Sequence, residues 1–310
     1  MTEVTSATGA GSAVGSDRMR VTVAGLGNMG AALARALVRG RCRVAVWNRT
    51  FSKAEILGAE GAVPVADLRE AVRASDVVVA CVSTCETVAA LFKPLRRELA
   101  GRIFVNLTTG TPGEVRSIAA WAAQNGIAYL SGTIMATPSL IGRPETLIFY
   151  GGDQGAFNAC RRILASFGGR AEYLGADPGL ASLYDLALLT MLYGAWYGHL
   201  HAHALLQKAG VSAMEVLPFV KEWVEFVVAP NLTDPAEAAA LDRRDYRTEE
   251  SNLAVNEWAI ELIIRASREA GVSAEWLVPI HRLASAKLQE GYGADSFTRV
   301  FDGILEQPVR

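Results

Sequence analysis

The chain has 310 residues, of which 51% are hydrophobic and 20% are charged, so it is globular rather than disordered and long enough for one large or two ordinary domains. Its 30 basic and 32 acidic residues give a net charge of −2, which provides no electrostatic reason to expect nucleic acid or an anionic membrane as a partner. Cys42, Cys81, Cys85 and Cys160 follow neither a zinc-binding nor a disulfide pattern, which predicts reduced thiols in a cytoplasmic protein without a bound metal.

Strand and helix patterns alternate in the first half of the chain. Residues 1–18 are rich in Gly, Ser, Ala and Thr and lack the apolar segment of a signal peptide, so we interpret them as a flexible tail. An apolar helical pattern follows the first strand and ends at Arg39. Two further helices begin at Asp67 and Thr111, each of which precedes a Glu by three positions, as in a capping box. The predicted strands are 20–24, 43–47, 77–82, 103–107, 127–130 and 146–150.

The strand pattern stops after about Pro178, and helical patterns continue to about Leu305. Alternating strands and helices predict an α/β fold with a mostly parallel, doubly wound sheet, and we expect this Rossmann-type domain over residues 19–176. Residues 177–310 are expected to form an all-helical domain that begins with a long interdomain helix.

A glycine-rich motif joins the first strand to the first helix, and it consists of Gly25, Leu26, Gly27, Asn28, Met29 and Gly30. The motif alone is weak evidence in a chain with 29 glycines, but a strand before it and a helix after it are the context of a dinucleotide-binding turn. Gly25 permits the tight turn, Gly27 lets a pyrophosphate approach the backbone, and Gly30 lets the helix pack against the strand. The helix N-terminus then offers N–H groups to the phosphates. A purely structural glycine turn is the alternative.

The end of the second strand carries Asn48, Arg49 and Thr50, and Lys53 follows one helical turn later. An NAD site usually has Asp or Glu here to bind the ribose hydroxyls, and this chain has no acid at that place. The guanidinium of Arg49 and the ammonium of Lys53 match a 2′-phosphate, while Asn48 and Thr50 can donate hydrogen bonds. The pattern favours NADPH, the alternative being solvated charges at a strand end.

Residues 178–207 form the most unusual segment, because they contain one formally charged side chain, Asp185, in an otherwise apolar helical pattern. Leu189, Leu192 and Trp196 share its helix face. A helix that is apolar nearly all round must be buried against neighbours or another subunit, and a lone carboxylate there is costly unless it is paired or functional. An Asp that forms a salt bridge or caps a helix is as consistent with this pattern as a catalytic one.

A membrane span is a poor interpretation of this segment, since it also contains three histidines and no basic flank precedes it. His199 and His203 are four residues apart and could share a metal ion, but no carboxylate ligand accompanies them. Core or interface histidines are the favoured interpretation.

Six motifs in order resemble NADPH-dependent imine reductases, which belong to the β-hydroxyacid dehydrogenase superfamily. They are Gly25 to Gly30, Asn48 to Lys53, Asn106 to Pro112, Gly132 to Pro138, Ile141 to Glu145 and Tyr184 to Leu189, and the resemblance covers the chain from about residue 20 to its end. It implies a Rossmann domain joined by a long helix to a helical domain for dimerisation and substrate binding. It also implies a reciprocal homodimer, in which the cofactor domain of one subunit meets the helical domain of the other.

The same resemblance implies site residues. Cofactor contacts are expected also at Val82, Thr84, Asn106 and Thr108. The substrate pocket is expected at Thr109, Met135, Trp223, Phe226 and Asn256.

Asp185 matches the position where imine reductases replace the catalytic Lys of the superfamily, and this chain has no Lys between Lys93 and Lys208. The replacement makes chemical sense, because a cationic iminium needs an anion nearby or an acid that protonates its nitrogen. Tyr193 matches a position whose hydroxyl can bind the amine. Thr109 matches a position that is Asn in some reductive aminases, so efficient coupling of a ketone with an amine is not implied.

The sequence therefore predicts a cytoplasmic, homodimeric imine reductase that transfers a hydride from NADPH to the C=N carbon of imines. Its substrate is a small-molecule imine, or a ketone plus an amine. A β-hydroxyacid dehydrogenase is the alternative enzyme, and the missing Lys argues against it. A non-catalytic NADP(H)-binding regulatory protein is the other alternative, and it leaves Asp185 unexplained.

Overall fold

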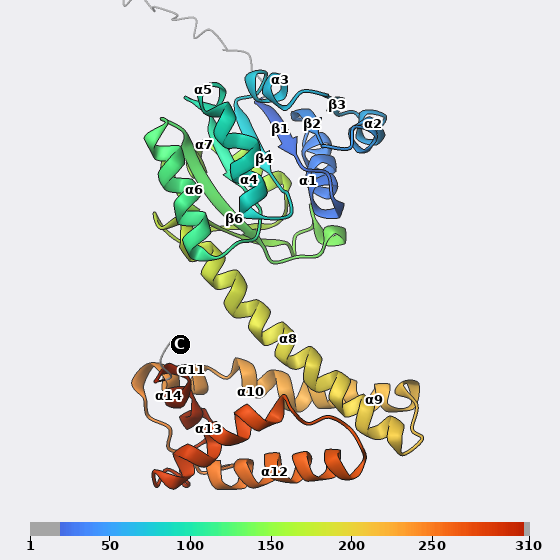
Figure 1. The fold of residues 1–310 in the computed structure, drawn as a ribbon, viewed down its shortest axis with the longest axis vertical. Helices are drawn as coiled ribbons and strands as arrows, with labels where there is room; N and C mark the ends of the chain where they lie inside the picture. The colour runs from blue at the N-terminus through green and yellow to red at the C-terminus, as the bar shows by residue number, and fades with distance from the viewer. Residues whose placement is uncertain (1–18, 307–310) are drawn as a thin grey trace, which may run out of the picture. The chain divides into compact units, whose positions relative to one another are not determined.

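The computed structural model describes residues 19–306, so the predicted tail over residues 1–18 lies outside the described residues. The chain divides into two compact units, and the division falls between Met191 and Leu192 within one long helix, α8 (Pro178–Lys208). Each unit is described by itself below (Figure 1).

An eight-stranded sheet forms the centre of the first unit, with the strand order β3-β2-β1-β4-β5-β6-β7-β8. Every neighbouring pair is parallel except β6 and β7, which are antiparallel. The strands are β1 (Arg20–Ala24), β2 (Arg43–Trp47), β3 (Val63–Pro64), β4 (Val77–Ala80), β5 (Ile103–Asn106), β6 (Ala128–Ile134), β7 (Leu147–Gly152) and β8 (Arg170–Tyr173). The predicted doubly wound sheet is confirmed, and the sequence analysis missed its two edge strands, β3 and β8.

Helices cover both faces of this sheet, and each face has its own buried apolar cluster. One cluster contains side chains of α1, α2 and α7, and the other contains side chains of α3, α4 and α6. The central strand β4 is completely buried, as its continuous apolar run predicts. The helices are α1 (Asn28–Arg39), α2 (Ser52–Gly58), α3 (Leu68–Arg73), α4 (Cys85–Phe92), α5 (Arg96–Leu99), α6 (Pro112–Gln124) and α7 (Gln154–Ser166), with short 3₁₀ helices at Lys93–Leu95 and Pro138–Leu140.

The second unit is built from helices, as predicted. After the last part of α8 it contains α9 (Ala213–Trp223), a π-helical stretch (Val224–Val228), α10 (Ala229–Thr233), α11 (Pro235–Arg243), α12 (Leu253–Glu269), α13 (Leu277–Gln289), a 3₁₀ helix (Phe297–Arg299) and α14 (Val300–Leu305). None of the helices within residues 19–306 is both long and apolar enough to cross a membrane.

A buried histidine connects three elements of the second unit. The indole N–H of Trp276 donates to Nδ1 of His201 at 3.1 Å, so Nε2 of the neutral ring carries the proton and donates to the Ser267 hydroxyl at 3.0 Å. Ser267 in turn donates to the carbonyl of Ile263 at 2.6 Å. This chain of bonds fixes α8 against α12 and the start of α13, and it makes His201 a structural residue.

A polar network around Asp302 supports the C-terminal part of this unit. The nearly buried carboxylate accepts hydrogen bonds from Tyr246 at 2.8 Å, Arg244 at 2.9 Å and Arg299 at 3.0 Å. The Arg299 guanidinium also lies over the ring of Tyr292, 3.8 Å from its centroid. Burial raises the pKa of Asp302, but the hydrogen bonds and the two guanidinium charges outweigh it and lower the pKa.

Replacing Asp302 by Asn tests this network. Because the folded-state pKa is lowered, the carboxylate stabilises the fold at neutral pH, and its contribution disappears as the pH falls through that pKa. We expect Asp302→Asn to cost about 1–3 kcal/mol at neutral pH, and the difference from wild type to shrink below about pH 4. Urea unfolding at several pH values measures this. The exposed Asp242 serves as control, and an equal effect of Asp242→Asn would contradict the assignment.

Candidate functional site

The turn between β1 and α1 is shaped by steric constraints at two glycines. Gly25 has a φ of +96°, and a Cβ atom there would lie 2.2 Å from the carbonyl oxygen of Cys81. A Cβ at Gly30 would lie 1.9 Å from the carbonyl oxygen of Gly25. Gly27 has open space around it, and no side chain caps the N-terminus of α1. The turn therefore presents unshielded backbone N–H groups, which fits the binding of a pyrophosphate.

A pocket of about 490 Å³ lies over this turn at the carboxyl ends of β1, β2 and β4. Eleven of the residues predicted to bind the cofactor line it: Gly25, Leu26, Gly27, Asn28, Met29, Gly30, Asn48, Arg49, Thr50, Lys53 and Val82. The structure thus brings the glycine turn and the end of β2 into one pocket, as the parallel order of the strands requires.

Five further residues of this pocket were not predicted: Trp47, Cys81, Ser83, Thr87 and Leu91. Their place after β4, next to β1 in the sheet, is the signal that could have identified Ser83, Thr87 and Leu91. Burial raises the pKa of the Cys81 thiol to about 11, so this side chain stays uncharged beside the turn at neutral pH.

Three other predicted cofactor residues do not line this pocket. Thr84 caps α4, its hydroxyl accepting the N–H of Thr87 at 3.1 Å. The Thr108 hydroxyl accepts the N–H of Val82 at 3.1 Å, and Asn106 accepts the N–H of Thr108 at 3.1 Å. Their side chains brace the ends of β4 and β5, because each is already bonded to the neighbouring backbone.

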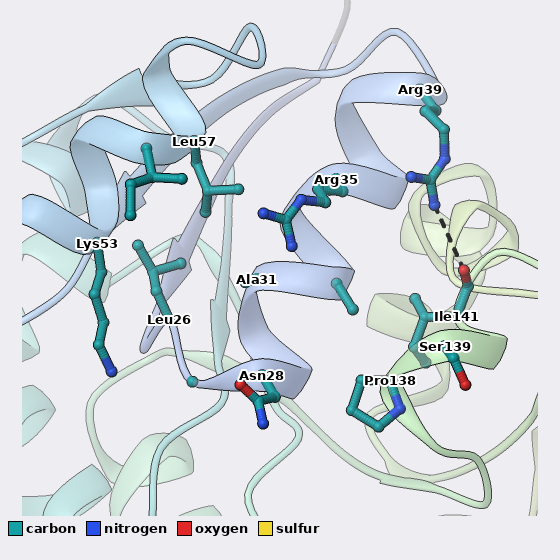
Figure 2. Close-up of a pocket in the computed structure, with 13 residues that line it drawn as sticks. Leu26, Asn28, Ala31, Arg35, Arg39, Lys53, Leu57, Pro138, Ser139 and Ile141 are labelled. Atoms are coloured by element: carbon teal, nitrogen blue, oxygen red, sulfur yellow. Dashed lines mark hydrogen bonds between the residues drawn. The ribbon is translucent and has the colours of Figure 1, made fainter.

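The cations at the end of β2 are free to bind an anion. Arg49 and Lys53 are exposed, and neither forms an ion pair within residues 19–306. A second pocket of about 580 Å³ shares Leu26, Gly27, Asn28 and Lys53 with the first (Figure 2). Two arginines of α1 extend over this second pocket, of which Arg35 is paired with Glu60 at 2.7 Å and Arg39 reaches the carbonyl of Ile141 at 3.5 Å. The surroundings of the glycine turn are therefore positively charged.

Asp185 is buried in the second turn of α8, with 6% of its surface exposed. Within residues 19–306 its carboxylate has no hydrogen-bond or ion-pair partner, so the structure shows neither the salt bridge nor the helix cap that a structural Asp would need. Burial raises the pKa of Asp185. Neighbouring contacts hold this part of α8: Ser182 donates to the carbonyl of Gly110, and the rings of Phe149 and Tyr184 lie 5.3 Å apart.

Tyr193 lies on the same helix eight residues after Asp185 and is 62% exposed. Trp223 and Phe226 are also exposed, at the end of α9 and in the π-helical stretch. The amide of Asn256 donates to the hydroxyl of Ser251 at 2.9 Å and thus belongs to the start of α12.

In the first unit, Thr109 follows β5 and is exposed, while Met135 follows β6 and is half-buried. Neither pocket described above includes them. His199 and His203 contact each other with ring centroids 4.4 Å apart, and the described part of the chain contains no group of three or more metal-ligating side chains.

A mostly parallel sheet with an uncapped glycine turn, and with unpaired cations after β2, defines a dinucleotide-binding protein of the Rossmann class. The model of the NAD binding domain of 6-phosphogluconate dehydrogenase matches residues 20–175, and the model of the NADPH-dependent reductive aminase-like C-terminal domain matches residues 177–306. The NADPH-dependent reductive aminase of Aspergillus oryzae is 34% identical over 285 residues, which cover 91% of this chain and 96% of the relative.

Solved structures agree with these matches. The reductive aminase from Aspergillus terreus in complex with NADPH and ethyl levulinate has a TM-score of 0.86 and 36% identity, and the match covers 93% of this chain and 99% of that one. The imine reductase from Myxococcus stipitatus in complex with NADP+ has a TM-score of 0.88 and 30% identity, with 92% and 99% covered. The chain therefore belongs to the family of NADPH-dependent imine reductases and reductive aminases.

Removing the Arg49 guanidinium tests the assignment of the cations to the 2′-phosphate. A charge-assisted hydrogen bond to phosphate contributes about 1.5–3 kcal/mol, so Arg49→Ala should weaken NADPH binding roughly tenfold to a hundredfold and barely change NADH binding. Fluorescence titration measures both dissociation constants. Arg43→Ala, at the other end of β2, is the control and should change neither. Equal effects of Arg49→Ala on both cofactors would exclude a contact with the 2′-phosphate.

Proposed function

We propose that this protein is an NADPH-dependent imine reductase, an oxidoreductase that reduces C=N bonds to amines with Asp185 as its main catalytic side chain. The buried carboxyl of Asp185, without a partner in the described part of the chain, is the observation that carries this proposal. Family membership supports the reaction, and the glycine turn with Arg49 and Lys53 supports the cofactor.

NADPH, when bound over the glycine turn, supplies the hydride that the imine carbon accepts. Reduction also requires a proton on the imine nitrogen, and Asp185 is suited to provide it, because burial brings its pKa closer to neutrality than that of an exposed carboxyl. Once Asp185 has given its proton to the imine nitrogen, its carboxylate stabilises the positive charge of the iminium that accepts the hydride. The Tyr193 hydroxyl is the proposed hydrogen-bond partner of the amine.

The substrates of the relatives support a second reaction. A structure of the Aspergillus terreus reductive aminase contains cyclohexanone and allyl amine, a ketone and an amine. We infer that this protein also acts on imines formed from such pairs. The β-hydroxyacid dehydrogenase alternative needs a Lys where Asp185 stands, and a purely regulatory NADP(H)-binding protein would have no use for a buried acid in α8.

Asp185→Asn keeps the shape of the side chain and removes both the proton donor and the charge. We expect kcat on a neutral imine such as 2-methylpyrroline to fall by about 10²- to 10⁴-fold, the usual contribution of general acid catalysis, while NADPH affinity is retained. Tyr193→Phe should lose less, because it removes one hydrogen bond. A fixed-charge iminium substrate needs no proton, so the loss should shrink for it. If Asp185→Asn keeps a kcat close to that of wild type on the neutral imine, Asp185 is a structural residue and the proposed mechanism is wrong.

We further propose that the protein is a homodimer whose second copy covers the apolar surface of α8. A band of large apolar side chains on this helix is between 40% and 62% exposed within one chain: Leu188, Met191, Leu192, Tyr193, Trp196, Tyr197 and Leu200. The sequence pattern requires this helix to be covered, and a single chain leaves the band open to solvent.

The four cysteines are free thiols, which fits the proposed cytoplasmic location.

Light scattering after size exclusion tests the dimer. An obligate dimer of this kind buries more than about 2,000 Å², so it should persist from nanomolar to micromolar concentration. Leu200→Glu should produce monomers, because it places a charge in the apolar band. Val63→Glu, on the exposed edge strand β3, is the control and should leave the dimer intact. A stable, active wild-type monomer would refute the dimer.

A further inference from the structure

The side chain of Asn48 connects two loops of the cofactor pocket. Its Oδ1 accepts the backbone N–H of Leu26, in the centre of the glycine turn, at 3.0 Å. Its Nδ2 donates to the backbone carbonyl of Thr50 at 3.1 Å. One amide group, placed directly after β2, thus uses both its acceptor and one of its donor hydrogens on the protein's own backbone.

These two bonds extend the connection between β1 and β2 beyond the last paired residues of the strands. The register of the two strands ends at the pair Ala24 and Trp47, and the N–H of Gly25 then donates to the carbonyl of Trp47 at 2.9 Å. Asn48 continues the connection by one step with a side chain instead of the backbone. The carbonyl of Thr50 also accepts the N–H of Lys53 at 3.2 Å, so the same connection reaches the first turn of α2.

The bonds also determine which groups remain free for a ligand. The N–H of Leu26 points to Asn48, so it is the N–H groups after Leu26, at the uncapped start of α1, that face a phosphate. Arg49 lies between Asn48 and Thr50, whose carbonyl Asn48 holds, and its own side chain is exposed without an ion-pair partner in the described residues.

We propose that Asn48 is a positioning residue, a clasp that sets the distance between the pyrophosphate turn and the cations for the 2′-phosphate before the cofactor binds. This role differs from the direct phosphate contact that the sequence suggested for Asn48, and it rests on the cofactor site proposed above. A direct ligand of the 2′-phosphate would matter for NADPH alone. A clasp that shapes the glycine turn affects the binding of the pyrophosphate. NADPH and NADH both contain this group, so the affinity for both should depend on Asn48.

Asn48→Ala removes both bonds, and Arg49→Ala is the matched control in the adjacent position. We expect Asn48→Ala to raise the dissociation constants of NADPH and NADH together, by about 5- to 30-fold for the loss of two hydrogen bonds. Arg49→Ala should change NADPH binding alone. In the enzyme without cofactor, the amide of Leu26 should exchange its hydrogen faster in Asn48→Ala and at the wild-type rate in Arg49→Ala.

Asn48→Asp tests the two hydrogen bonds separately, because a carboxylate keeps the acceptor for the Leu26 N–H and loses the donor for the Thr50 carbonyl. In the enzyme without cofactor, Asn48→Asp should leave the exchange of the Leu26 amide closer to the wild-type rate than Asn48→Ala does. The proposal is overturned if Asn48→Ala weakens NADPH alone, if the exchange of the Leu26 amide is unchanged in Asn48→Ala, or if Asn48→Asp speeds that exchange as much as Asn48→Ala. If the cofactor site itself were wrongly assigned, the result would be different, because the wild-type enzyme would then bind neither NADPH nor NADH.

Discussion

The close approach of the β1–α1 turn to the end of β4 is the constraint on which the cofactor pocket depends. No Cβ atom fits at Gly25, where the carbonyl of Cys81 occupies the space, or at Gly30, where the carbonyl of Gly25 does. Because the backbone can approach so closely, the N-terminus of α1 reaches the edge where β2 and β4 also end. Backbone N–H groups, Arg49 and Lys53 then line the same pocket, as the proposed recognition of a pyrophosphate and a 2′-phosphate in one molecule requires.

Local and non-local determinants explain how far the sequence could predict this structure. The glycine turn and the buried strand β4 were predicted because sterics and continuous apolarity act over a few neighbouring residues. Strand β8 was missed because Arg170–Tyr173 has four residues and no continuous apolar run, and β3 because Val63–Pro64 has two residues. Strand β6 continues to Ile134 because its second half pairs with β7, a contact that the sequence pattern does not reveal.

Side-chain partners were the least predictable part of the site. Asn106 ends β5 and Thr108 follows it, which is where cofactor ligands are expected. The Thr108 hydroxyl, however, accepts the N–H of Val82, while Asn106 accepts the N–H of Thr108 and donates to the Tyr129 hydroxyl. Thr87 and Leu91 line the pocket because the sheet order puts β4 beside β1, and nothing in their own residue type indicates a ligand. The second pocket depends on α1, α2 and the 138–141 segment coming together, which only the tertiary structure determines.

The two ends of the proposed reaction depend on opposite electrostatic conditions. Arg49 and Lys53 are exposed and without ion-pair partners in the described residues, so in the proposed site they bind a phosphate at little desolvation cost and are open to screening by salt. Asp185 is buried, and the cost of burying its charge raises the pKa of its carboxyl, which favours the proposed proton transfer. A fully paired carboxylate would destabilise the fold less, but its partner would oppose the rise in pKa that burial causes. In the proposed mechanism, the unpaired Asp185 therefore costs folding stability and serves in proton transfer.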